Sequence, residues 1–168
     1  MSGFTHILTY DGGELVAQIP NNCDISEFSN PLRHFNGDDQ WALGLAPLPP
    51  DKTYEQMLAA DELSTEYLQA AGLPDMMTVE IRKPGGAQWG AAWVRYTIGH
   101  RCATQEPRDV PIRLAHGVKM ISRSQVFGAE EAADMFFVYY QSGDIAPDYD
   151  LQPIEGYRTD GSVVHLNV

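Results

Sequence analysis

His100, Arg101 and Cys102 are the residues whose types and spacing come closest to a nucleophilic site in this chain. A histidine can accept the proton of a thiol, and a neighbouring guanidinium favours the thiolate, which is the reactive form of cysteine. Glu106 follows and adds an acidic group to such a site. The sequence identifies no third residue that orients the histidine, so an ordinary, unreactive surface cysteine is the competing interpretation.

Other catalytic signatures are missing from the sequence. The chain has no Walker loop, no H-E-x-x-H, no G-x-S-x-G and no EF-hand loop. Its five histidines stand at no metal-ligand spacing, and Cys23 and Cys102 form neither a C-x-x-C pattern nor a disulfide framework. Adjacent acidic pairs, such as Asp38 with Asp39 and Asp61 with Glu62, are typical of solvated turns. We therefore expect no metal, no cofactor and no enzyme activity.

Charge is segregated along the chain. Residues 1–81 carry thirteen acidic and two basic side chains, residues 82–123 two acidic and eight basic, and residues 124–168 eight acidic and one basic. The net charges of these blocks, −11, +6 and −7, add to the formal −12. Folding does not require such segregation, so the outer blocks suggest a surface for a basic partner, with a uniformly solvated acidic surface as the alternative. We expect the central block to pair with acidic neighbours inside the fold.

Tyr149 stands between Asp148 and Asp150 in residues 144–150, DIAPDYD, which we predict to form an acidic loop. Tyrosine is enriched at binding hot spots, and flanking carboxylates would steer a cationic partner towards it. The alternative is a tyrosine that packs over the closing hairpin. The predicted partner-binding residues come from this loop or from an earlier acidic turn, and they are Asp144, Asp148, Tyr149 and Asp150, or Asp38 and Asp39.

The positioning elements are mainly hairpins. Short runs with strand character flank turn sequences such as Asp11-Gly12-Gly13, which supplies the positive φ angles of a tight turn. Four pairs of strands are predicted, at residues 5–10 with 14–19, 77–83 with 88–98, 110–114 with 118–122, and 152–157 with 162–167. A further strand is predicted at residues 40–46. The turn of the second hairpin is expected at residues 84–87.

Helical periodicity marks three segments. A short helix is predicted at residues 24–35, and a second from near Thr53 towards residue 71, with Asp61 as an alternative start of a separate helix. The clearest helix begins near residue 129, repeats apolar residues at i, i+3 and i+4, and ends before Gly143. Hairpins with helices between them, without regular β-α-β alternation, indicate an α+β fold. We expect a single domain over residues 1–168, a mainly antiparallel sheet, and two to four helices packed on it.

Size and composition restrict the protein class. A chain of 168 residues is about the length of one domain. No stretch approaches the roughly 20 apolar residues that cross a bilayer, and the first residues lack the basic and apolar regions of a secretory signal. The pI of about 4.6 opposes binding to nucleic acid or anionic membranes. These features predict a soluble, cytoplasmic protein.

Residues 124–157 have the sequence SQVFGAEEAADMFFVYYQSGDIAPDYDLQPIEGY. This stretch resembles the C-terminal part of small actinobacterial immunity proteins, in particular the immunity factors of the tuberculosis necrotizing toxin, a secreted NAD+ glycohydrolase. The acidic N-terminal hairpin around Asp11-Gly12-Gly13 and the chain length also suit that family. The resemblance implies an antitoxin that binds a folded toxin domain as a 1:1 heterodimer in the cytoplasm and occludes its active site.

The expected partner is therefore a basic or phosphate-binding toxin domain. A site that cleaves NAD+ must bind a pyrophosphate, so it is expected to present cationic groups and helix N-termini that a carboxylate-rich surface can cover. Two other interpretations remain open from the sequence. One is a small enzyme that uses Cys102 and His100, and the other is an acidic protein-interaction module with a different partner.

Overall fold

The computed structural model describes residues 3–49, 51–59 and 66–166, which contain ten strands and three helices. The strands are β1 (Phe4–Tyr10), β2 (Leu15–Pro20), β3 (Ala42–Pro47), β4 (Tyr67–Leu73), β5 (Met76–Gly86), β6 (Ala91–His100), β7 (Val110–Leu114), β8 (Gly117–Ile121), β9 (Tyr149–Tyr157) and β10 (Val163–Val164). The helices are α1 (Ser26–Arg33), α2 (Tyr54–Ala59) and α3 (Ala129–Ser142), and a short 3-10 turn, η1 (Arg123–Gln125), precedes α3.

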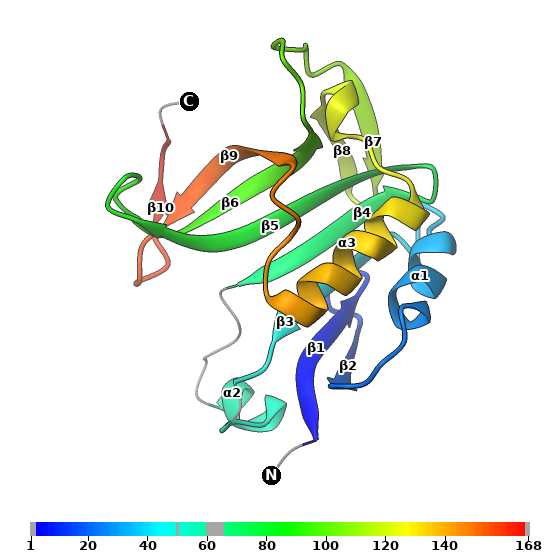
Figure 1. Ribbon diagram of the computed structural model, residues 1–168, viewed down its shortest axis with the longest axis vertical. Helices are drawn as coiled ribbons and strands as arrows, with labels where there is room; N and C mark the ends of the chain where they lie inside the picture. The colour runs from blue at the N-terminus through cyan, green and yellow to red at the C-terminus, as the bar shows by residue number, and fades with distance from the viewer. Residues whose placement is uncertain (1–2, 50, 60–65, 167–168) are drawn as a thin grey trace.

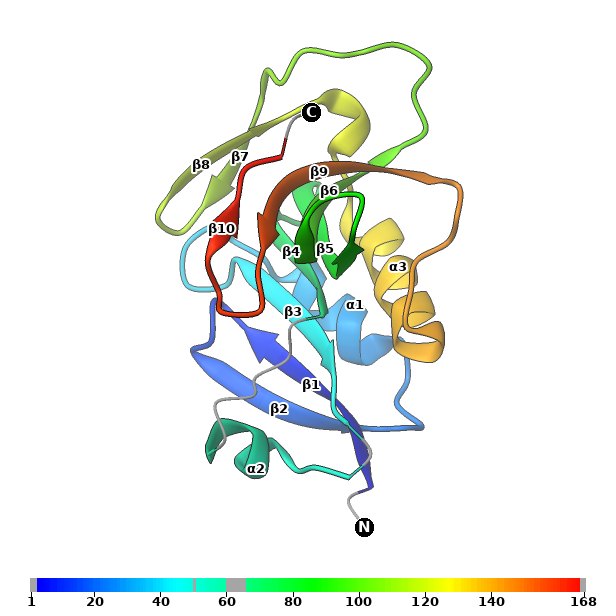
Figure 2. The ribbon, with the colours of Figure 1, turned by 90° about the vertical axis from the view of Figure 1, so that its left-hand side faces the viewer.

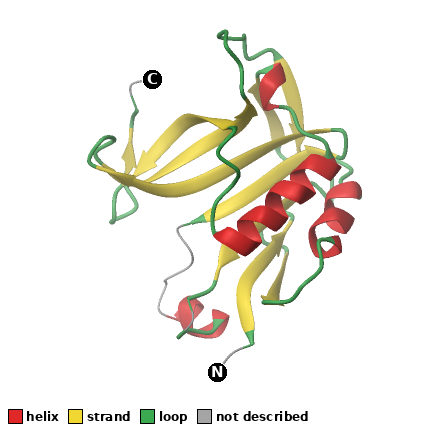
Figure 3. Ribbon diagram, viewed as in Figure 1, coloured by secondary structure: helices red, strands yellow, loops and turns green. Residues whose placement is uncertain are grey.

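Eight strands form one antiparallel sheet in the order β10-β9-β6-β5-β4-β3-β1-β2, and β7 pairs with β8 in a separate ribbon. Helices α1 and α3 lie side by side on one face of the large sheet (Figure 1). The side view shows the β7–β8 ribbon beside the opposite face, which we call the open face (Figure 2). Strands and helices are segregated into layers (Figure 3). The predicted α+β class, with a mainly antiparallel sheet, is confirmed.

The hydrophobic core lies between the large sheet and the two packed helices. Alternate residues of each strand point to this side, so Leu8, Leu45 and Leu68 are buried against α1 and α3. The rings of Phe28 in α1 and Phe136 in α3 pack with centroids 6.0 Å apart. One core therefore includes residues from the first strand to the last helix. It fixes the end of β6, the start of β9 and one side of α3 relative to one another.

Helix α3 follows the sequence pattern closely. It covers Ala129–Ser142, and Gly143 ends it in the left-handed conformation with φ 82°. The backbone N–H of Gly143 donates to the carbonyl of Tyr139 at 2.8 Å. The buried face of α3 includes Met135 and Tyr139, which lie outside the i, i+3, i+4 repeat. Phe137, which belongs to that repeat, is only partly covered. The helix reaches the core on one side and leaves a polar stripe on the other.

The predicted helix from Thr53 towards residue 71 is wrong in its second half. Helix α2 spans only Tyr54–Ala59, and its capping box is present, with Thr53 and Gln56 bonded to each other's backbone N–H at 2.9 and 3.1 Å. Residues 67–73 form β4 instead, between β3 and β5. Two ladders of backbone hydrogen bonds and burial on both sides outweigh the helical propensity of Leu, Gln and Ala. Asp61 lies outside the described residues.

Two further boundaries differ from the predictions. Residues 84–86 belong to β5, and the turn of that hairpin follows at residues 87–90. Gly85 permits this, because a Cβ there would lie 2.5 Å from the carbonyl oxygen of Ala91. Strand β9 begins at Tyr149, so Tyr149 and Asp150 are strand residues rather than the end of a loop.

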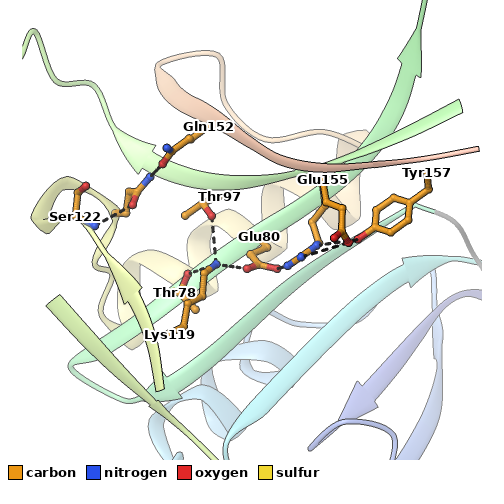
Figure 4. A network of polar contacts seen from close by, with 10 residues as sticks. Thr78, Glu80, Thr97, Lys119, Ser122, Gln152, Glu155 and Tyr157 are labelled. Carbon is orange, nitrogen blue, oxygen red and sulfur yellow. Dashed lines mark hydrogen bonds and ion pairs between the residues drawn. The ribbon is translucent and has the colours of Figure 1, made fainter. Parts of the chain in front are cut away.

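A polar network joins the β7–β8 ribbon to the open face of the sheet (Figure 4). Lys119 of β8 donates to Thr97 at 3.2 Å and forms an ion pair with Glu80 of β5. Glu80 also accepts from Arg95 of β6 at 2.7 Å, and Arg95 lies 3.8 Å from Glu155 of β9. Lys119 and Arg95 belong to the basic block of residues 82–123, and Glu80 and Glu155 belong to the two acidic blocks on either side of it. Basic and acidic blocks therefore pair within the fold, as expected from the charge pattern.

Replacing Gly72 with alanine is expected to destabilise the fold by about 1–3 kcal/mol, because Gly72 has φ +133° and an added Cβ would lie 2.7 Å from the carbonyl oxygen of Met76. Urea denaturation followed by circular dichroism measures the change. Gly3→Ala is the matched control, since nothing lies within 4 Å of a Cβ at Gly3. Equal midpoints for the two variants would show that the β4–β5 turn tolerates a side chain.

Candidate functional site

One end of β6 and β9 brings together the two sets of residues that the sequence proposes separately. In the antiparallel register, His100 pairs with Tyr149 and Gly99 pairs with Asp150. Cys102 follows β6 directly, and its backbone N–H donates to Asp150 Oδ2 at 3.1 Å. The proposed nucleophile and the proposed interface loop are therefore neighbours, and a single region must be judged for both roles.

Tyr149 is half-buried and makes defined contacts. Its ring packs 5.8 Å from that of Phe127 and 6.1 Å from that of His100. Its hydroxyl donates to Glu131 Oε2 of α3 at 2.9 Å. Burial, the hydrogen bond to Glu131 and the neighbouring negative charges raise the pKa of Tyr149, so the hydroxyl remains a donor. The ring packs below the surface, and the carboxylates around it face the solvent.

Carboxylates from a helix, a loop and a strand lie around or next to Tyr149, and we call this group the acidic edge: Glu131 and Asp134 of α3, Asp148 of the loop before β9, and Asp150 of β9. Glu131, Asp148 and Asp134 all lie close enough to act electrostatically on the Tyr149 hydroxyl. Asp134, Asp148 and Asp150 are exposed. Among the described residues, none of these three forms an ion pair with a cation. The acidic edge thus keeps an uncompensated negative charge at the surface.

Glu131 and Asp134 are the two residues of the acidic edge that were not predicted from the sequence. They are three residues apart on α3 and therefore share one face of the helix. That spacing was available in the sequence as a polar stripe beside the apolar one. Its approach to Tyr149 was not available, because it depends on how α3 crosses β6 and β9.

His100 and Cys102 do not form a nucleophile–base pair. The Nδ1 of His100 lies 2.9 Å from the carbonyl oxygen of Ser124, and its Nε2 lies 2.9 Å from the carboxylate of Glu131. Both ring nitrogens are therefore engaged away from the thiol. Strand β6 ends at His100, so Cys102 lies beyond the strand.

The thiol of Cys102 faces acceptors. It donates to the carbonyl of Thr104 at 3.1 Å and to Glu106 Oε1 at 3.2 Å. The hydrogen bond from Cys102 is the main cause that lowers the pKa of Glu106. The cavity of about 190 Å³ beside Cys102 has a lining of mixed charge, with Arg108 and His100 beside Glu106 and Asp150.

The other predicted interface residues lie elsewhere or have structural partners. Asp144 forms an ion pair with Lys83 at 3.0 Å and follows the end of α3. Asp38 and Asp39 belong to a turn organised by Asn36, which donates to Asp39 at 2.7 Å and accepts from the N–H of Asp38 at 2.8 Å. The α1–β3 and α3–β9 connections lie on opposite sides in Figure 2. The two predicted acidic surfaces are therefore separate.

Comparison with known proteins finds no matching family model, no matching curated protein and no matching solved structure. Within residues 3–49, 51–59 and 66–166, no three His, Cys, Asp or Glu side chains are grouped so that they could hold a metal ion. The helices of these segments are too short or too polar to cross a membrane. The candidate site is therefore defined by its geometry alone, as a carboxylate-rich surface on an α+β domain.

Proposed function

We propose that this protein is an immunity protein that binds a cognate toxin in the cytoplasm, one to one, and inhibits it by covering its active site. The proposed toxin is an NAD+ glycohydrolase whose pyrophosphate-binding cleft carries positive charge. The observation that carries the proposal is the acidic edge, where exposed Asp134, Asp148 and Asp150 have no cationic partner among the described residues.

Several physical features make this edge suitable for a basic partner. Three of its four carboxylates come from α3 and β9, which share one core, so a rigid arrangement meets the partner with little loss of conformational freedom. Negative potential at a surface accelerates association with a cationic protein and fixes its orientation. The resemblance of residues 124–157 to immunity proteins covers the same helix and loop.

A direct assay of NAD+ loss tests the proposal. The purified toxin domain is incubated with NAD+ and with increasing amounts of this protein, and the remaining NAD+ is measured. We expect complete inhibition near a 1:1 ratio. Full toxin activity in stoichiometric excess of the protein would rule out this function. An unrelated acidic protein of similar charge is the control for non-specific electrostatic inhibition.

A further inference from the structure

The open face of the large sheet contains a cavity that the proposed function does not use. It has a volume of about 490 Å³, in the range typical of small-molecule sites. Strands β1, β2, β3 and β4 form its floor, and Tyr54 of α2 contributes to its wall. Its lining is mixed, with apolar residues such as Ile7 and Val16 beside the polar side chains of Thr9 and Gln69.

Gly44 lies at the centre of this floor, and folding does not explain why a glycine is there. It pairs with Thr9 of β1 and with Gln69 of β4 in regular antiparallel registers, without a bulge. Its φ is not in the left-handed region. A Cβ added at Gly44 would meet only ordinary contacts, the nearest being Thr9 Cβ at 3.8 Å.

Glycine inside a strand weakens it, and it is usually explained by a bulge, a bend or the close approach of a backbone or ligand. The regular registers and the 3.8 Å contact leave the approach of a ligand as the remaining explanation for Gly44. A side chain at position 44 would project from the floor into the cavity and reduce its volume. The missing side chain therefore leaves open space in the cavity above Gly44.

Positive charge lies along the same face, next to the cavity. Tyr67, which lines the cavity, pairs with Arg82 of β5, and Arg82 pairs with Arg95 of β6. Like charges directly opposite each other on neighbouring strands are unfavourable. Arg95 is compensated by Glu80 and Glu155. Arg82 has no ion pair with any described residue.

The guanidinium of Arg82 stacks on the ring of Tyr157 at 4.1 Å from the centroid. Its Nε is enclosed and has no hydrogen-bond partner within the described part of the chain. A buried N–H without an acceptor costs about 1–3 kcal/mol, so the Arg82 guanidinium is held at a cost that folding leaves unrepaid. In a protein of net charge −12, this cation without a carboxylate partner beside a partly apolar cavity indicates an anionic group as the ligand.

We propose that the open face binds a small amphipathic carboxylate, with its apolar body over Gly44 and its carboxylate against Arg82. Arg82 lies two strands away from Gly44. It is also two residues along β5 from the position in register with Gly44, so the two residues are separated by about 12 Å. That span fits a medium-chain acyl group. Tyr67 lies between the two ends, and burial, as the main cause, raises the pKa of its hydroxyl, which therefore stays protonated as a second donor. A guanidinium pairs well with a planar carboxylate.

Decanoate is the probe for a calorimetric titration of the full chain. We expect saturable 1:1 binding of decanoate. Decanol lacks the negative charge and acetate lacks the apolar chain, so each should bind at least about ten-fold more weakly. Arg82→Gln should weaken decanoate binding by about ten-fold or more. Arg113→Gln, which changes an exposed arginine of β7 that does not line the cavity, should leave it unchanged.

Gly44→Val separates binding from folding. Valine favours strands and has room for its Cβ, so the thermal midpoint should be equal to or above that of the parent while decanoate binding is lost. Gly44→Ala provides a smaller filling if valine lowers the midpoint. The proposal is overturned if decanoate does not saturate, or if Arg82→Gln or a folded Gly44 variant binds it as the parent does. None of these variants alters the acidic edge, so toxin inhibition tests the proposed function separately.

Discussion

Glu80→Gln is expected to lower the free energy of unfolding by about 3 kcal/mol, because it leaves the charges of Lys119 and Arg95 without their shared carboxylate. The Glu80 side chain is only 12% exposed, whereas Lys119 and Arg95 keep 24% and 26% exposure. Water can partly solvate the two cations, which places the effect at the lower end for a broken buried pair. Urea denaturation at pH 7 measures the change.

Glu155→Gln is the matched control for this variant. Glu155 also faces Arg95, but at 3.8 Å and with 37% of its side chain exposed. Exposed pairs contribute about 0–1 kcal/mol, so this substitution should have little effect. If both variants unfold at the same urea concentration, the network does not stabilise the attachment of the β7–β8 ribbon to the sheet.

The contribution of Glu80 also depends on pH. Burial would raise its pKa, but the charges of Lys119 and Arg95 and their hydrogen bonds outweigh burial and lower the pKa. A carboxyl group with a lowered pKa in the folded state contributes fully above the pKa of an unfolded glutamate, about 4.3, and loses its contribution as the pH falls through the folded value. The stability difference between the parent and Glu80→Gln should therefore be constant near neutral pH and shrink below about pH 4.

Local signals in the sequence predicted those elements whose boundaries depend on their own residues. The end of α3 follows from Gly143, and the start of α2 follows from the capping box of Thr53 and Gln56. Strand β4 was missed because its conformation depends on partners. Residues 67–73 become a strand only because β3 and β5 lie on either side of it, at positions that local periodicity does not encode.

The site divides in the same way. Asp148, Tyr149 and Asp150 were found because they are adjacent in the sequence and have an unusual composition. Glu131 was missed, although it accepts the Tyr149 hydroxyl and contacts His100. Its role depends on the packing of α3 across the ends of β6 and β9. Likewise, the separation of His100 from Cys102 depends on where β6 ends, which the spacing of the two residues cannot indicate.

Reversing two charges of the acidic edge is expected to reduce toxin inhibition by about 100-fold, because close charge pairs across an interface couple strongly. The variant is Asp134→Lys with Asp148→Lys. Both side chains are exposed and have no ion pair with a described residue, so the fold should be retained. Asp144 and Asp150 are left unchanged, because Asp144 binds Lys83 and Asp150 accepts from the backbone of Cys102.

Asp38→Lys with Asp39→Lys is the control of equal charge, since each pair of substitutions changes the net charge from −12 to −8; its thermal midpoint is measured too, because Asp39 accepts a hydrogen bond from Asn36. The two pairs lie on different sides of the molecule, so only a local effect can distinguish them. Inhibition is measured as NAD+ loss over a range of salt concentrations, because screening weakens the parent more than a variant that lacks the attraction. Greater damage from the Asp38 and Asp39 variant would move the interface to the α1–β3 turn. Equal damage would mean that the toxin responds to net charge and that the acidic edge has no special role.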